Sequence, residues 1–180
     1  MNVSLDGYIT DPAGSLDWSV PSREVFRFHI DQIRDVDVHL LGRRLYETML
    51  YWETADQNPD ADPDDLEWTA LWKALPRVVF SNSLTEVVGN ARLASGSLEE
   101  EITRLRSEPG EGQIAIGGPD LASQAAELDL IDEYRLVVYP VLLGGGTSYF
   151  PQGARKVDLD LVETRLFEGG ITYWRYQVRR

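Results

Sequence analysis

Three short segments place glycine or small polar residues directly after apolar runs. They are Gly42-Arg43-Arg44, Ser81-Asn82-Ser83 and Gly117-Gly118-Pro119. In an open α/β sheet, ligands bind beyond the carboxyl ends of the strands, where helix N-termini present free backbone N–H groups. A glycine there lets a phosphate approach the backbone closely, and arginine adds charge and forked donors. Three such junctions on successive strands suit a dinucleotide, whose adenosine phosphate, pyrophosphate and nicotinamide ribose must all be held.

Each segment also has a purely structural interpretation. A Gly-Gly pair before a helix commonly forms a turn, and neighbouring arginines are usually solvated. Neither G-x-G-x-x-G nor G-x-x-x-x-G-K-[ST] occurs in the chain, so the sequence does not support a standard Rossmann or P-loop site. The repetition of the pattern at three strand ends is what favours a shared binding site.

Length, charge and composition restrict the class of protein. The chain has 180 residues, enough for one domain with a substantial core. A net charge of −13 argues against nonspecific binding to nucleic acid or anionic membranes, because the long-range field repels both. The absence of Cys excludes disulfides, thiolate zinc sites and cysteine nucleophiles. No apolar stretch approaches the roughly 20 residues that span a bilayer, and no signal peptide is visible. We expect one domain over residues 1–180 of a soluble, cytoplasmic protein.

Hydrophobic periodicity predicts the elements that position these segments. Expected strands are 2–9 (broken at 6–7), 36–41, 77–80, 91–94 and 113–116, and expected helices are 22–34, 44–52, 66–75, 97–107 and 119–128. Ser22 and Ser97 are the expected N-caps of two helices. From Glu133 onward, apolar and polar residues alternate with a period of two, which predicts strands at 134–140, 159–167 and 171–179. The last two strands are expected to form a hairpin across Glu168-Gly169-Gly170. The order predicts an α/β fold with a mixed, mostly parallel central sheet, helices on both faces and a C-terminal antiparallel hairpin.

Residues 53–65 are rich in Asp and Pro and predict a solvated acidic loop. A metal site built from these Asp residues is the alternative interpretation. The loop separates the helix expected at 44–52 from the one expected at 66–75.

Several motifs occur in one order along the whole chain. They are Ser4-Leu5-Asp6-Gly7-Tyr8-Ile9, Asp17-Trp18, Gly42-Arg43-Arg44-Leu45-Tyr46-Glu47, Ile116-Gly117-Gly118, Ile131-Asp132-Glu133-Tyr134 and Pro140-Val141-Leu142-Leu143-Gly144-Gly145-Gly146. Together they resemble the dihydrofolate reductase-like superfamily. The most similar branch is the reductase domain of the bifunctional riboflavin-biosynthesis deaminase-reductase and its stand-alone relatives.

This resemblance implies a cofactor, NADPH, and the residues that bind it. Gly42, Arg43 and Arg44 match the turn that grips the NADPH phosphates, and Ser81 and Asn82 match the pair that contacts the adenosine 2′-phosphate. The residues that match the glycine turn under the pyrophosphate and nicotinamide ribose are Gly117, Gly118, Pro119, Asp120 and Leu121. Arginine and serine suit a 2′-phosphate, whereas an acid would be expected for NADH.

Candidates for the chemistry lie elsewhere in the chain. Asp6 matches the Asp of the family's Ser-Leu-Asp-Gly motif, with a turn-forming Asp-Gly as the alternative. Glu24 is the second catalytic candidate, with an exposed first-turn acid as its alternative. Trp18 is expected in the substrate pocket or in the core. His29 and His39 lie in apolar patterns and are expected to be packed histidines.

Departures from the family pattern restrict the reaction. In true folate reductases a carboxylate follows the Trp by about five residues, but here that position is Arg23 and Glu24 comes next. The chain also lacks the Cys residues of the zinc deaminase domain. The resemblance implies an NADPH-dependent reductase of a small heterocyclic or ribosylamino substrate. The alternatives are a pterin, dihydrofolate-type or other carbonyl or imine reductase, and a non-catalytic nucleotide-binding protein.

A homodimer is also expected. Tyr173, Trp174 and Tyr176 alternate along the last strand, and Tyr149-Phe150 adds apolar surface. A two-fold dimer is the commonest soluble assembly.

Overall fold

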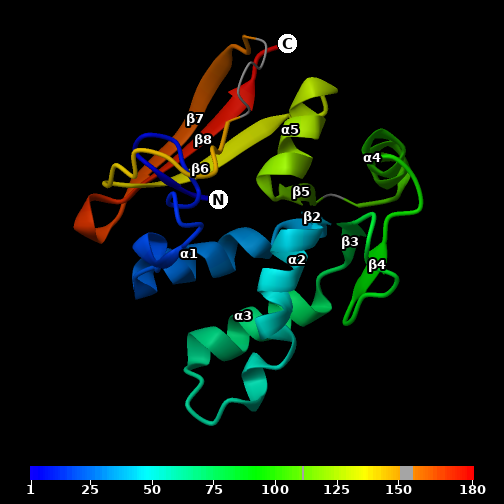
Figure 1. The fold of residues 1–180 in the computed structure, drawn as a ribbon, viewed down its shortest axis with the longest axis horizontal. Coiled ribbons are helices and arrows are strands. Elements are labelled where there is room, and N and C mark those ends of the chain that lie inside the picture. Colours follow the sequence, from blue (N-terminus) through cyan, green and yellow to red (C-terminus); the bar gives the residue numbers. More distant parts are fainter. Residues whose placement is uncertain (111, 151–155) are drawn as a thin grey trace. The chain divides into compact units, whose positions relative to one another are not determined.

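The structure is a computed structural model and describes residues 1–110, 112–150 and 156–180. The chain forms two compact parts: a terminal part, Met1–Val25 with Ala125–Arg180, and a central part, Phe26–Gln124. Each part holds one four-stranded sheet, and Figure 1 labels α1–α5 and β2–β8. Among the described residues, none of the helices has the length and apolar character needed to cross a membrane.

The central sheet is parallel throughout, in the order β4-β3-β2-β5. Its strands are β2 (Val36–Gly42), β3 (Arg77–Phe80), β4 (Ala91–Leu93) and β5 (Gln113–Gly117). The helices α2 (Arg43–Met49), α3 (Pro63–Ala74) and α4 (Leu98–Ser107) lie in this part, while α1 (Arg23–Ile33) and α5 (Pro119–Glu127) cross its two boundaries. Each strand named here begins within one residue of its expected position.

The terminal sheet is mixed, in the order β1-β6-β8-β7. β1 (Asn2–Ser4) pairs in parallel with β6 (Glu133–Tyr139), while β8 (Thr172–Val178) pairs antiparallel with both β6 and β7 (Leu159–Leu166). β6, β8 and β7 lie side by side in Figure 1. The expected hairpin is confirmed, and Gly169 adopts a φ of +73° in its turn. The α/β class is confirmed, but the described strands form two sheets of four instead of one sheet.

Local capping explains where the helices begin. Ser97 Oγ accepts a hydrogen bond from Glu100 N, while Ser97 N donates to Glu100 Oε2 at 2.8 Å, so α4 starts with a capping box. Ser22 Oγ likewise accepts from Val25 N at the start of α1.

The expected acidic loop is partly wrong. α3 begins at Pro63, three residues before the predicted start, because Asp62 Oδ1 accepts hydrogen bonds from Asp64 N and Asp65 N. Asp64 is itself buried and pairs with Arg27 of α1 at 3.1 Å. A short 3-10 turn at Ala55–Gln57 shortens the loop further. The Asp residues therefore cap and tie helices, and the described residues contain no grouping of three metal-ligating side chains.

A buried ion pair ties the beginning of β3 to the region after α2. The Arg77 side chain is fully buried, and its Nη1 lies 2.5 Å from Glu53 Oε1. Trp72 of α3 donates its indole N–H to the same oxygen at 3.0 Å, and the Arg77 guanidinium lies over the Trp72 ring. A buried charge is tolerated only when it is paired and hydrogen-bonded. Glu53 is therefore a structural residue of the central part.

We predict that Glu53→Ala lowers the free energy of unfolding by about 3–5 kcal/mol, because it leaves the Arg77 charge buried without its carboxylate. Urea unfolding followed by circular dichroism measures this. Glu47→Ala is the matched control, since Glu47 pairs with Arg43 at the surface and such pairs contribute about 0–1 kcal/mol. Equal stability losses in the two variants would contradict the assignment.

Candidate functional site

The three segments predicted from the sequence lie at one edge of the central sheet. β2 pairs with both β3 and β5, and the register sets Gly42 opposite Phe80 and Leu41 opposite Gly117. Because parallel strands share one direction, their carboxyl ends meet at the same edge. The turns that follow β2, β3 and β5 are therefore neighbours. We call residues 42–44, 81–83 and 117–119 the turn edge.

Gly42 leaves open space at this edge. It precedes α2 in an extended conformation, with φ −72° and ψ 156°, and no side chain caps the helix. A Cβ at Gly42 would meet no atom within 4 Å, and its backbone angles suit any residue. Packing therefore does not require glycine at this position, so the open space is available to a ligand.

The two arginines differ in their contacts. Arg43 Nη1 lies 3.2 Å from Glu47 Oε1, one helical turn along α2. Arg44 is exposed, and among the described residues its guanidinium forms no ion pair. Arg44 is therefore the more available cation, whereas Arg43 must release or share Glu47 to bind an anion.

The turn after β3 is shaped by Ser81. Its Oγ accepts hydrogen bonds from Ser83 N at 3.1 Å and Leu84 N at 3.0 Å. Ser81 Oγ also lies 3.4 Å from Ser83 Oγ, so its hydroxyl hydrogen can donate either to Ser83 or to a ligand. Asn82 is exposed at the tip of this turn. Two polar side chains are therefore presented beside the Gly42 turn.

Gly117 and Gly118 are glycines for different reasons. A Cβ at Gly117 would overlap the Leu45 side chain and lie 2.8 Å from His39 Nε2. Gly118 has a φ of +96°, a conformation that side chains disfavour. Burial lowers the pKa of His39 to about 4, with Arg77 acting in the same direction, so its imidazole is neutral at neutral pH and packs as expected. Packing therefore requires glycine at position 117, and backbone conformation favours glycine at position 118.

The first turn of α5 completes the turn edge. Pro119 has no backbone N–H, Asp120 is exposed, and Leu121 is buried at 4% exposure. The side chain of Leu121 belongs to the core, so Leu121 could face a ligand only through its backbone N–H group, whereas Asp120 also has an exposed side chain.

The remaining candidates lie in the terminal part. Trp18 stands edge-on to Tyr139, with ring centroids 5.6 Å apart, and its buried Nε1 has no hydrogen-bond acceptor among the described residues. Asn2 Nδ2 donates to Ser19 O and to the Tyr139 hydroxyl. Burial raises the pKa of Tyr139 to about 12, so its hydroxyl stays protonated. Trp18 therefore packs into an aromatic wall beside the terminal sheet.

The Asp6 carboxylate is held by three hydrogen-bond donors. Ser4 Oγ donates to Oδ1 at 2.6 Å, and Leu143 N and Gly144 N donate to Oδ2 at 3.1 and 2.8 Å. The Ser4 hydrogen bond and the two backbone N–H groups lower the pKa of Asp6 below its usual value. Asp6 is therefore ionised at neutral pH.

Glu24 has structural partners as well. Its Oε2 accepts from Glu168 N at 3.0 Å, and its Oε1 lies 3.7 Å from Arg165 Nη2. These contacts tie the first turn of α1 to the β7–β8 hairpin. Sequence reasoning missed the partners of both acids, because Asp6 and Leu143 are 137 positions apart and no local pattern joins them.

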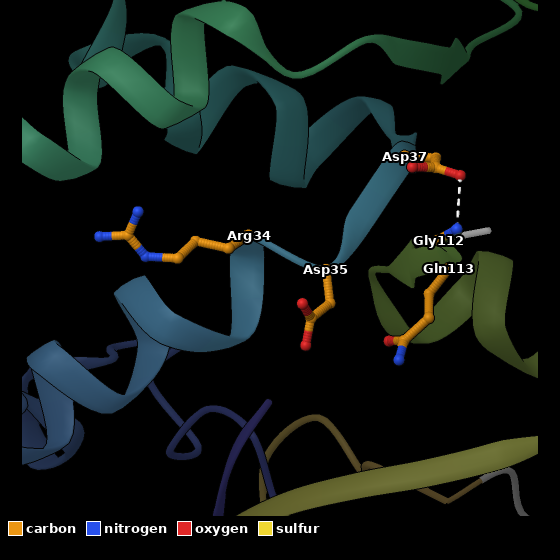
Figure 2. Close-up of a pocket in the computed structure, with 5 residues that line it drawn as sticks. All are labelled: Arg34, Asp35, Asp37, Gly112 and Gln113. Atoms are coloured by element: carbon orange, nitrogen blue, oxygen red, sulfur yellow. Dashed lines mark hydrogen bonds between the residues drawn. The ribbon is translucent and has the colours of Figure 1, made fainter. Parts of the chain in front are cut away.

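A hollow of about 380 Å³ lies at the opposite end of the central sheet from the turn edge. It is lined by Arg34, Asp35, Asp37, Gly112 and Gln113 (Figure 2). Asp37 Oδ2 accepts from Gly112 N at 2.8 Å, and Arg34 pairs with Glu67. None of the predicted site residues lines this hollow.

The architecture belongs to a known class of reductase folds. Dihydrofolate reductase of Enterococcus faecalis, in a complex with NADP(H), aligns with a TM-score of 0.64 and 16% identity over 99% of this chain and 94% of that one. The deaminase/5-amino-6-(5-phosphoribosylamino)uracil reductase of Thermotoga maritima gives a TM-score of 0.67 and 15% identity. That alignment covers 99% of this chain but 55% of the bifunctional protein. The chain has the dihydrofolate reductase-like fold.

The sequence itself matches one protein family. Residues 1–173 match the RibD C-terminal domain, and the chain belongs to that family. A protein of Shewanella sp. PV-4, provisionally described as a riboflavin biosynthesis protein, is 27% identical with a TM-score of 0.78, over 100% of this chain and 97% of that one. The uncharacterized YyaP of Bacillus subtilis strain 168 is 28% identical over 172 residues, 94% of this chain and 87% of that protein.

We predict that two glycine substitutions at the turn edge differ in their effect on stability. Gly117→Ala should lower the free energy of unfolding by about 1–3 kcal/mol, because the methyl group displaces Leu45 and His39. Gly42→Ala should change it by less than about 0.5 kcal/mol, as expected for an open surface position. Denaturant unfolding of both variants measures the difference. A destabilised Gly42→Ala protein would show that the space above Gly42 is not open.

Proposed function

We propose that the chain is an NADPH-dependent reductase of the riboflavin-biosynthesis type, which transfers hydride to a small heterocyclic or ribosylamino substrate. Its substrate would resemble 5-amino-6-(5-phosphoribosylamino)uracil. The observation that carries the proposal is the convergence of three turns on one edge of the central sheet. Membership of the RibD C-terminal domain family and the reductase named in the Thermotoga maritima protein support the reaction type.

The residues of the turn edge fit a dinucleotide phosphate. Gly42 is open, Arg44 carries an unpaired charge in the described part of the chain, and Gly118 adopts a positive φ of +96° that favours glycine. Gly42, Arg43 and Arg44 would hold phosphates, and Ser81 and Asn82 would contact the 2′-phosphate. The turn of residues 117–121 would support the pyrophosphate and nicotinamide ribose.

Such a cofactor supplies hydride, so the protein mainly needs to position the reactants. In the proposed reaction Trp18 would line the substrate pocket, and Asp6 and Glu24 are the candidate carboxylates. A general acid works best with a pKa near the working pH. The lowered pKa of Asp6 therefore favours a role for its anion over proton donation.

One observation favours the non-catalytic alternative, a nucleotide-binding protein. The carboxylates of both Asp6 and Glu24 accept backbone N–H groups, as purely structural acids do. Cofactor oxidation separates these functions. A reductase oxidises NADPH with the ribosylamino-pyrimidine phosphate, and a pterin-type enzyme does so with dihydrofolate or a pterin. Tight NADPH binding without turnover on any such compound supports the non-catalytic protein.

A cytoplasmic homodimer is part of the proposal, with its contact surface on one face of the terminal sheet. Leu161 and Leu166 of β7 are 56% and 72% exposed. The register sets Leu161 opposite Tyr176, and Thr164 between the leucines lies opposite Trp174, so these apolar side chains share a face. Tyr173 faces the other way and is buried at 1% exposure, so the expectation that it contributes to the dimer surface is wrong.

We predict that NADPH binds at least roughly tenfold more tightly than NADH. Arg44→Met should weaken NADPH by about ten- to a hundredfold, as expected for loss of a charged hydrogen bond of about 1.5–3 kcal/mol, and should leave NADH less affected. Isothermal titration measures both affinities. Lys156→Met, which removes an exposed cation of the terminal part, is the control. Equal affinities of the wild-type protein for the two cofactors would refute the assignment.

We predict a homodimer at micromolar concentration that the double variant Leu161→Asp/Leu166→Asp converts to a monomer. Four buried carboxylates in a two-fold interface would repel one another and lose their hydration. Sedimentation velocity measures the assembly, and Val88→Asp, at an exposed apolar residue of the central part, is the control. A monomeric wild-type protein would contradict the proposal.

A further inference from the structure

Two segments of the terminal part run alongside each other: residues 5–10 and residues 141–149. Leu5 N donates to Val141 O at 2.9 Å, Ile9 N to Thr147 O at 2.8 Å and Tyr149 N to Gly7 O at 2.8 Å. Thr147 N also donates to Thr10 Oγ1. These bonds fix both ends of the later segment through backbone groups.

The middle of the later segment is held by a side chain instead. Leu143 N and Gly144 N both donate to the Asp6 carboxylate. Ser4 Oγ donates to the same carboxylate and accepts from Tyr8 N at 2.9 Å. Ser4 is 1% exposed, so a buried hydroxyl fixes the orientation of the Asp6 side chain. We call this set of bonds the Asp6 clasp.

Apolar burial does not explain the order of this loop. Leu142 is 71% exposed, and Gly144 and Gly146 adopt φ values of +71° and +117°. A Cβ at Gly146 would overlap the backbone of Thr10 and Asp11. Glycine-rich backbone loses much conformational entropy on ordering. Charge-assisted hydrogen bonds to an anion are stronger than neutral ones and can offset that cost.

We propose that Asp6 is a positioning residue: its anion fixes the backbone of Leu143 and Gly144, and with it the glycine-rich loop of residues 141–149, and it exchanges no proton with substrate. The inference rests on the proposed reductase function for its kinetic part only. The clasp itself is a property of the terminal part. Cofactor binding at the turn edge does not depend on it.

The test compares Asp6→Asn, Asp6→Ala and Ser4→Ala with the wild-type protein. Amide hydrogen exchange resolved by NMR should show Leu143 and Gly144 exchanging about tenfold faster or more in Asp6→Asn, because the amide offers one acceptor oxygen in place of two. Asp6→Ala should have the larger effect and Ser4→Ala a smaller one. Ile9 and Tyr149, whose amides bond to backbone carbonyls, should keep their protection. Asp60→Asn, at an exposed carboxylate of the central part, is the control for lost charge.

Kinetics complete the test. For a positioning residue, kcat/KM for the ribosylamino-pyrimidine phosphate falls in parallel with the loss of amide protection, and Asn retains more activity than Ala. The shape of the pH profile of kcat stays that of the wild type, and the Kd for NADPH stays within about twofold.

Three results would overturn the inference. Lost activity with intact protection of Leu143 and Gly144 indicates direct chemistry by Asp6. Intact protection together with intact activity shows that the clasp is dispensable. Lost protection with full activity shows that the loop needs no positioning. If the wild-type enzyme turns over none of the substrates, the proposed function fails, while the exchange measurement still decides whether the clasp holds the loop.

Discussion

Parallel hydrogen bonding of β2 to β3 and β5 is the constraint on which the candidate cofactor site depends. It aligns three strand ends, so turns that are far apart in the sequence become neighbours. The same strand anchors the core, since Leu40 and Leu41 are fully buried. Gly117 couples the two roles, because the space left by its missing side chain is filled by Leu45 and His39. A slip of register at β2 would therefore disturb the core and the turn edge together.

The two parts of the chain use their polar groups differently. At the turn edge of the central part, Gly42 leaves open space and Arg44 carries a charge that no described residue pairs. In the terminal part, the carboxylates of Asp6 and Glu24 accept hydrogen bonds from backbone N–H groups of distant loops. The proposed hydride transfer would suit this division, because a nicotinamide cofactor supplies the chemistry and the protein mainly binds and orients the reactants. In that proposal the acids of the terminal part would contribute through the geometry that they maintain.

Sequence reasoning succeeded where the signal is local. The Ser97 capping box and the turn at Glu168-Gly169-Gly170 are encoded within a few residues, and both occur as expected. It failed at the Asp62 cap, which lies inside a segment whose composition suggested a loop. It also failed where structure depends on distant partners, since the backbone donors to Asp6 lie about 137 positions away. The division of the strands into two sheets was missed for the same reason, since periodicity does not show which edges pair. The sequence alone also could not show that Arg44 is more available than Arg43. Glu47 lies about one helical turn from both arginines, and only the coordinates show that its carboxylate pairs with Arg43.

We propose that the turns following β2, β3 and β5 bind one NADPH molecule, and titration of NADPH into isotopically labelled protein, followed by amide chemical shifts, tests this. We expect the amides of Gly42–Arg44, Ser81–Ser83 and Gly117–Gly118 to shift together and to fit a single Kd, while those around the hollow at Asp35 and Asp37 do not move. Shifts confined to one turn, or centred on that hollow, would contradict it.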